Sequence, residues 1–335
     1  MREELPHGLD ERIFDPGIPF EARLQEVLAY QRKASPIYDT FYRSLMPHGD
    51  LADPPSPDNL PLLPIEAFKE ARICTVPPKP DELYFQSSGT GSMKRATHPV
   101  PDPELYRRSV QNGFDLVYPA GSVILAWLPG YEENPHSSLI WMIQALIDRD
   151  TTGQSRFVTK EEIQQGLPDD LQTGRPILLI GAAFGLIDLA ESGNRPLPQG
   201  LTLIETGGMK THRREMSKQE LRARLSEGFN LPLEQIHSEY GMCELLSQAY
   251  ATDGIHFETP HWMRVSIRKG ENPMQACTPG EEGRIGILDL ANLYSCPFLL
   301  TGDRGVMDEK GRFQVLGRWQ PTDLRGCNFL VDTDG

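Results

Sequence analysis

Short apolar segments alternate with helical segments through the middle of the chain, and this alternation restricts the fold more than any other feature. The segments typical of buried strands are residues 122–127, 177–180 and 201–204, and those typical of helices are residues 137–147 and 182–191. Ser217 and Glu220 have the spacing of a capping box, which begins a further helix. Strands that alternate with helices favour a mostly parallel sheet covered by helices on both faces. We therefore predict an α/β fold.

The two ends of the chain have different patterns. Residues 20–45 are typical of an amphipathic helix that Pro36 interrupts, because proline removes a backbone donor. Beyond about residue 260 the helical pattern ends, and short segments typical of strands follow between Gly and Pro turns. These segments are residues 263–268, 284–290 and 312–316. We expect a smaller β-rich lobe there, packed on the α/β lobe.

The expected organisation is one large domain followed by a short tail. The large domain covers residues 1–316, with the α/β lobe at about 1–258 and the β-rich lobe at about 259–316. The tail covers residues 317–335.

Composition argues against several classes of partner. The formal net charge of −14 disfavours a surface for nucleic acid or for anionic membranes. The first residues lack the apolar core of a signal peptide, and the longest apolar stretch, residues 176–190, is shorter than the roughly 20 residues that cross a bilayer. The five cysteines are odd in number and have no C-x-x-C spacing, so neither a zinc site nor a disulfide framework is indicated. We expect a cytoplasmic protein with no nucleic-acid partner and no membrane insertion.

A loop rich in hydroxyls and glycines follows the strand-like residues 82–85. Glycine lets the backbone approach a phosphate closely, and hydroxyls and backbone amides serve as donors. A cation beside the loop neutralises polyphosphate charge. The alternative interpretation is an ordinary surface turn, in which Ser/Gly runs are common. The candidate phosphate-binding residues are Ser87, Ser88, Gly89, Thr90 and Gly91, with Lys94 as the nearby cation.

A second polar cluster follows the apolar residues 231–236. Tyr240, Gly241 and Glu244 stand at the expected end of a strand, which is where open α/β sheets bind ligands. Glu244 supplies a carboxylate of the kind that Mg²⁺ prefers. The alternative is a surface turn with a solvated glutamate.

A third polar cluster lies in the β-rich lobe. Asp303 is flanked by glycines in Thr301-Gly302-Asp303-Arg304-Gly305, and Arg318 follows Gly317 a short distance later. A carboxylate fixed on such a turn suits a ribose diol, which donates two hydrogen bonds to it. The alternative is an Asx turn between two strands of a meander.

The order of these motifs resembles the adenylate-forming superfamily, which comprises acyl- and aryl-CoA ligases, adenylation domains of peptide synthetases, and luciferases. The resemblance covers about residues 83–318. It implies the large N-terminal domain of that superfamily as the fold, with ATP and Mg²⁺ bound. The phosphate loop differs at one point: it reads Ser-Ser-Gly-Thr-Gly, one residue shorter than the Ser-Ser-Gly-Thr-Thr-Gly usual in the family.

The resemblance also implies a role for each candidate residue. The loop at 87–91 would cradle the β- and γ-phosphates beside Lys94. Tyr240 and Gly241 would face the adenine or α-phosphate, Glu244 would bind Mg²⁺, Asp303 would hold the ribose hydroxyls, Arg318 would contact ribose or phosphate, and Gly207 and Gly208 would line the junction of acyl group and adenine.

The end of the chain carries a narrower resemblance. In the superfamily a C-terminal domain beyond the Gly-Arg turn normally supplies a catalytic lysine, and we expect this chain to lack that domain. Lys210 is the candidate for partly replacing the lysine, with an ordinary basic loop as the alternative. Arg325-Gly326-Cys327 resembles the LuxE-type acyl-protein synthetases, which activate fatty acids for a bacterial reductase and carry an acyl-accepting cysteine near the C-terminus.

We therefore predict ATP-dependent activation of a carboxylic acid, expected to be a fatty acid, as an acyl-adenylate. The acyl group would then form a thioester with Cys327, a thiolate being a strong nucleophile. An acyl reductase or a carrier protein would be the partner that receives it. Two alternatives remain open: a ligase that transfers the acyl group to CoA or a carrier, with Cys327 as an incidental cysteine on the tail, and a non-catalytic protein that binds acyl groups or nucleotides.

Overall fold

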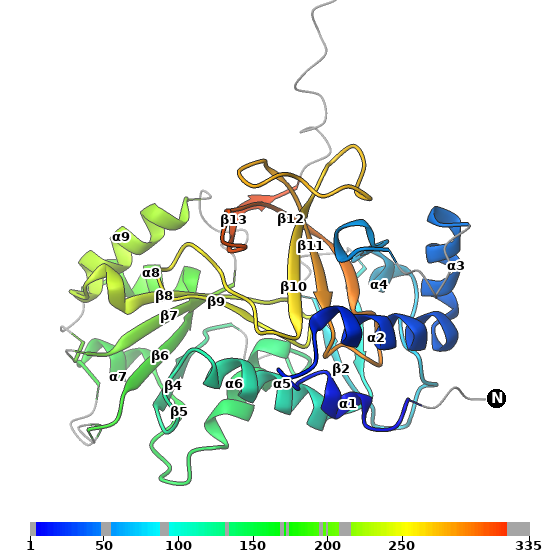
Figure 1. Cartoon of the computed structure of the whole chain (residues 1–335). Coiled ribbons are helices and arrows are strands. Elements are labelled where there is room, and N and C mark those ends of the chain that lie inside the picture. The colour runs from blue at the N-terminus through cyan, green and yellow to red at the C-terminus, as the bar shows by residue number, and fades with distance from the viewer. Residues whose placement is uncertain are drawn as a thin grey trace, which may run out of the picture.

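The structure is a computed structural model, and it describes residues 5–47, 55–87, 94–130, 134–167, 171, 174–193, 197–198, 200–207 and 216–319. Figure 1 shows an α/β part and a β-rich part that lie against each other. Within the described ranges, no helix is both long enough and apolar enough to cross a membrane.

A sheet of six strands forms the centre of the α/β part. Its order is β5-β4-β6-β7-β8-β9, and all neighbours pair in parallel except β8 and β9. The strands are β4 (Val123–Trp127), β5 (Arg156–Phe157), β6 (Ile177–Ala182), β7 (Thr202–Thr206), β8 (Ile236–Tyr240) and β9 (Ala249–Ala251). The predicted α/β fold with a mostly parallel sheet is therefore confirmed.

Successive residues of a strand point to opposite faces of the sheet, and apolar side chains on both faces pack against helices. Ile124 and Ile204 belong to one buried cluster, together with residues of α5 (Pro103–Asp115) and α6 (Ser138–Ile147). Leu125 and Leu203 belong to the other cluster. That second cluster includes residues of α7 (Lys160–Gln164), α8 (Ala183–Glu191) and α9 (Lys218–Phe229). Ser217 caps α9 by accepting a hydrogen bond from the backbone of Glu220.

A second sheet forms the predicted β-rich part. Its strands are β10 (Met263–Arg268), β11 (Gly283–Asp289), β12 (Phe298–Met307) and β13 (Phe313–Arg318), which pair antiparallel in sequence order. A fifth strand comes from far earlier in the chain, because β1 (Leu63–Pro64) pairs in parallel with β12. The sheet is therefore built from two distant segments, a feature that the sequence pattern did not predict.

The N-terminal helices pack against the β-rich part (Figure 1). They are α1 (Leu9–Arg12), α2 (Phe20–Ala34), α3 (Pro36–Leu45) and α4 (Ala67–Glu70), with a 3-10 turn at Pro57–Asn59. The predicted interruption at Pro36 is present: Ser35 ends α2, and its hydroxyl caps α3 by accepting from the backbone of Tyr38. Gln31 of α2 donates to the carbonyl of Leu293 at 2.7 Å, which ties the helix to the segment between β11 and β12.

A separate two-stranded sheet flanks the candidate phosphate loop. Its strands, β2 (Leu83–Gln86) and β3 (Thr97–Val100), pair antiparallel, with Gln86 opposite Thr97. The strand predicted to precede the loop is thus present. A second 3-10 turn, Leu233–Gln235, leads into β8.

Candidate functional site

Three of the predicted site residues meet where the two large sheets approach each other. Tyr240, the last residue of β8, donates a hydrogen bond from its hydroxyl to Asp303 Oδ2 at 2.9 Å. Arg318 Nη1 lies 3.1 Å from the other carboxylate oxygen, Oδ1. Asp303 and Arg318 also face each other in the β12–β13 register. The carboxylate of Asp303 is therefore held from the α/β part on one side and from the β-rich part on the other.

Aromatic packing fixes the Tyr240 ring. It contacts Phe257 and Phe313 edge-on, with ring centroids 5.9 and 5.5 Å away. Burial raises the pKa of Tyr240 well above its ordinary value, and the negative charge of Asp303 raises it further. The hydroxyl consequently stays protonated and acts as a donor toward Asp303.

The segment after Tyr240 is anchored by buried polar side chains from the β-rich part. Asp289 accepts hydrogen bonds from the backbone of Leu246 (2.9 Å) and Ser247 (3.0 Å), and from the Ser247 hydroxyl (2.6 Å). Asn292 Nδ2 donates to the carbonyl of Glu244 at 2.8 Å. Buried groups with partners of this kind hold a loop in one conformation. Glu244 is itself buried, at 6 % exposure.

A buried histidine completes this anchor. His98 of β3 lies at hydrogen-bond distance from the Cys243 carbonyl (2.6 Å) and from Asn292 Oδ1 (3.1 Å). Burial lowers the pKa of His98 to about 4, so the ring is neutral near pH 7. The strand that follows the candidate phosphate loop is thereby connected to the Tyr240–Glu244 segment.

Polar side chains also connect the ends of β7 and β8. The Ser238 hydroxyl donates to Glu205, which also forms an ion pair with Lys218 of α9. The Thr206 hydroxyl donates to Glu239. Gly207 follows with φ of 75°, a conformation that glycine adopts without strain.

The described residues of the candidate phosphate loop lie at its two ends. The Ser87 backbone donates to the Ala96 carbonyl at 3.1 Å, and the Ser87 hydroxyl accepts from the Ala96 backbone at 3.0 Å, so the loop closes at its base. Lys94 Nζ forms an ion pair at 3.0 Å with Glu70; the two side chains are 61 % and 75 % exposed. Because such exposed pairs contribute little, this contact holds Lys94 only weakly.

Seven predicted site residues lie outside the described ranges. They are Ser88, Gly89, Thr90, Gly91, Gly208, Lys210 and Cys327. Gly241, which is described, continues directly from Tyr240.

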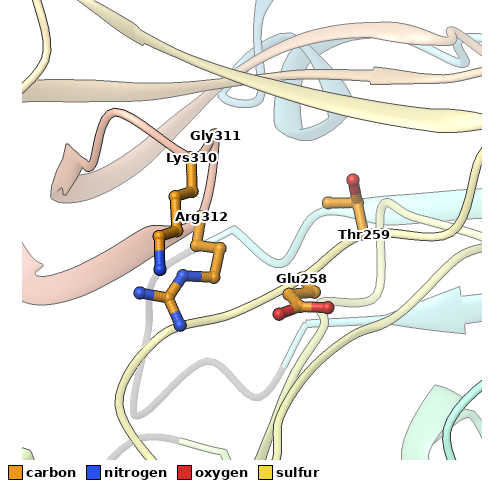
Figure 2. Close-up of a pocket in the computed structure, with 5 residues that line it drawn as sticks. All are labelled: Glu258, Thr259, Lys310, Gly311 and Arg312. Carbon is orange, nitrogen blue, oxygen red and sulfur yellow. The ribbon is translucent and has the colours of Figure 1, made fainter.

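A surface pocket of about 440 Å³ lies near the β12–β13 turn (Figure 2). Glu258 and Arg312, which line it, are the chain neighbours of Phe257 and Phe313. Phe257 and Phe313 pair in an isolated β-bridge, and both rings pack on Tyr240. Because side chains alternate along extended segments, Glu258 and Arg312 point away from Tyr240, so the pocket lies on the other side of this bridge. Arg312 is held by Asp308 at 2.8 Å. We assign this pocket no part in the site.

Sequence reasoning missed the polar connections behind the site. Asp289, Asn292 and His98 hold the segment after β8, while Thr206 and Glu239 join two strand ends. A signal was present in one case, because Glu205 and Glu239 place charged residues in strands that are otherwise apolar and buried.

The two-sheet architecture is that of the adenylate-forming enzymes. 2-Hydroxyisobutyryl-CoA ligase in its postadenylation state, in complex with 2-HIB-AMP, is similar with a TM-score of 0.64 and 16 % identity, over 95 % of this chain and 69 % of that chain. An open conformation of that ligase, in complex with 2-HIB-AMP and CoA, is similar with a TM-score of 0.61 and 15 % identity, over 89 % of this chain and 69 % of that chain. At these identities the likeness establishes the fold, which confirms the predicted fold class.

A comparison of the sequence with protein families gives a narrower class than the fold does. Residues 168–334 match the family of acyl-protein synthetases, LuxE. This match confirms the resemblance to the LuxE acyl-protein synthetases over these residues. No curated protein matches the sequence.

Proposed function

We propose that this chain activates a carboxylic acid with ATP and transfers the acyl group to its own Cys327. The observation that carries the proposal is the LuxE family match, which spans both Cys327 and the cluster of Tyr240, Asp303 and Arg318. Family membership supports an adenylate-forming ligase. Beyond this chemistry, we propose that the acid is a fatty acid and that the accepting thiol is Cys327.

Asp303 and Tyr240 are the proposed ribose and adenine contacts. The Asp303 carboxylate is a strong acceptor for a ribose diol, since hydrogen bonds to charged acceptors exceed neutral ones in strength. Of its two neighbours, Arg318 is the more accessible, with 55 % of its side chain exposed. We propose that Arg318 turns from Asp303 toward the nucleotide phosphate when ATP binds, whereas the buried Tyr240 stays.

We propose Glu244 as the residue that would hold a magnesium ion. In the described parts of the chain no three His, Cys, Asp or Glu side chains form a metal-binding group. Mg²⁺ beside nucleotides is commonly held by one or two carboxylates together with phosphate oxygens and water, and Glu244 meets that need. The ion would screen the charge between two reacting anions.

The proposed reaction has two steps. An oxygen of the substrate carboxylate attacks the α-phosphorus of ATP, the bond to the β-phosphate oxygen breaks, and pyrophosphate leaves. The Cys327 thiolate then attacks the acyl carbonyl, the carbon–oxygen bond to AMP breaks, and a thioester forms. The glycines at 207–208 and the loop at 87–91, with Lys94, are proposed to hold the acyl-phosphate junction and the outer phosphates. Lys210 would supply a cation beside them.

The test combines pyrophosphate exchange with intact-mass measurement. The full chain is incubated with ATP, Mg²⁺ and a series of straight-chain and aromatic acids, with and without CoA. We expect acid-dependent exchange and an acyl adduct that hydroxylamine removes and that Cys327→Ala abolishes. Cys277→Ala is the matched control, because Cys277 lies in the β-rich part, next to the bridge between Ala276 and Arg268.

Two outcomes would contradict the proposal in different ways. Exchange and free acyl-CoA without an adduct would make the chain a CoA ligase with an incidental Cys327. The absence of both exchange and adduct across the acid series would leave a binding protein on this fold.

A further inference from the structure

Two side-chain hydrogen bonds join the last register pairs of β7 and β8, one on each face of the sheet. Glu205 is opposite Ser238, and Thr206 is opposite Glu239. Ser238 donates to Glu205 on the face covered by α9, and Thr206 donates to Glu239 on the face covered by α5. The two strands are thus connected at the residues immediately before Gly207 and Tyr240.

The two carboxylates differ in their surroundings. Glu205 is fully buried and pairs with Lys218. Glu239 is 6 % exposed, and its hydrogen bond comes from the neutral Thr206 hydroxyl. Among the described residues, no cation lies at hydrogen-bond distance from Glu239, and a buried carboxylate of this kind is costly.

Glu239 also contacts the turn that carries Tyr240 and Gly241. A Cβ atom placed on Gly241 would lie 2.6 Å from Glu239 Oε1, which shows how closely the carboxyl group packs on that backbone. Glu239 therefore touches the end of β7 through Thr206 and the turn after β8 through Gly241.

We propose that Glu239 is a positioning residue, whose hydrogen bond with Thr206 sets the spacing of the β7 and β8 ends and thereby aims Tyr240 at Asp303. The inference rests on the proposed adenylation function. Glu239 itself does not touch nucleotide; it acts through the strand ends that do.

The protonation state of Glu239 gives this role a measurable signature. Burial raises the pKa of Glu239 to about 7, and Glu205 adds to the rise, while the Thr206 hydrogen bond and Lys218 oppose it. The other titratable groups that face it are Tyr106 of α5, Tyr118 beyond α5 and Tyr250 of β9. Burial raises the pKa of all three tyrosines, so they stay neutral and Glu239 alone among these groups titrates near pH 7.

The neutral form is the one that fits an adenylating site. Deprotonation puts a negative charge on a buried carboxyl group, and the charge of Glu205 in the adjacent strand opposes it. It also adds negative charge near the place proposed for an anionic nucleotide. The site should consequently weaken as the pH rises through about 7.

The experiment measures the pH profile of kcat/KM for ATP in pyrophosphate exchange, together with thermal unfolding from pH 5 to pH 8.5. Glu239→Gln keeps the shape and stays neutral, so we expect it to abolish the wild-type decline above pH 7. Glu234→Gln, the same change at an exposed position five residues earlier, is the matched control and should follow wild type. Thr206→Val should lower kcat/KM about tenfold, and Thr206→Ser should restore it, because serine keeps the hydroxyl.

The results separate this inference from the proposed function. If wild type exchanges pyrophosphate but Glu239→Gln has the same pH profile, the positioning role is overturned and the function stands. If no acid supports exchange, the function fails, and the unfolding data decide the role of Glu239. In that case, equal changes of the melting temperature with pH in wild type and Glu239→Gln would overturn it.

Discussion

Replacing Asp303 by asparagine tests the centre of the site with little change of shape. In the structure one carboxylate oxygen accepts a hydrogen bond from buried Tyr240 at 2.9 Å, and the other forms an ion pair with Arg318 at 3.1 Å. Asparagine keeps one acceptor but loses the charge, so a bound ribose would lose a charge-assisted pair of hydrogen bonds. Such bonds contribute about 1.5–3 kcal/mol, which corresponds to a roughly 10- to 150-fold weaker Kd for ATP or AMP.

The cost to the fold should be smaller than the cost to binding. The partner ion, Arg318, is more than half exposed, and an ion pair of this kind contributes about 0–1 kcal/mol. Calorimetric titration with AMP and ATP, paired with thermal unfolding, would therefore show a large loss of affinity and a small loss of stability. Asp308→Asn, on the turn of the same β12–β13 hairpin, is the control that should bind normally.

The refuting result is equally specific. If Asp303→Asn binds AMP within about threefold of wild type while retaining its fold, Asp303 does not hold the ribose. A large loss of stability with unchanged affinity would make Asp303 a structural link between the sheets instead.

Three further predictions concern residues around this centre. The pKa of Glu239 is raised from 4.5 to about 7 in the folded state, so the free energy of unfolding should fall by about 3 kcal/mol as the pH rises across that range. In denaturant titrations Glu239→Gln should remove this pH dependence. The same pH dependence in wild type and Glu239→Gln would contradict the prediction. Asn292→Ala removes the hydrogen-bond donor to the Glu244 carbonyl, so we expect the free energy of unfolding in urea to fall by roughly 1–3 kcal/mol and Mg²⁺-dependent pyrophosphate exchange to weaken. An unaltered urea midpoint would show that other contacts hold the segment after Tyr240. Lys94→Ala breaks only an exposed pair with Glu70, so the melting temperature should stay within about a degree while the KM for ATP rises; loss of stability without a change in KM would make Lys94 structural.

The sequence predicted the elements of the α/β part well, because each strand and helix there carries its own local signal. The apolar residues at 177–180 and the cap at Ser217 needed no knowledge of distant contacts, and both elements are present. The observed strand boundaries differ from the predicted ones by one or two residues where a strand continues into polar residues, as β7 does at Glu205 and Thr206.

The contacts within the site were beyond prediction from local pattern. The meeting of Tyr240 with Asp303 depends on how two sheets pack, and the pairing of Thr206 with Glu239 depends on a register that is set by the whole sheet. Motif order drew attention to Tyr240, Asp303 and Arg318, which the structure brings together. Asn292 and His98 belong to no motif, and only their burial in the structure reveals them.

The pairing of β1 with β12 has a consequence for how this protein is made. Leu63 lies beside Leu299, so the second sheet remains incomplete until nearly three hundred residues have left the ribosome. Contacts between segments so far apart in sequence form slowly and leave their partners exposed in the meantime. The segment around β1 must therefore wait, with its apolar side chains uncovered, while the whole parallel sheet is synthesised. It follows that residues 168–334, which carry the family match, would lack a strand of their own sheet if expressed alone.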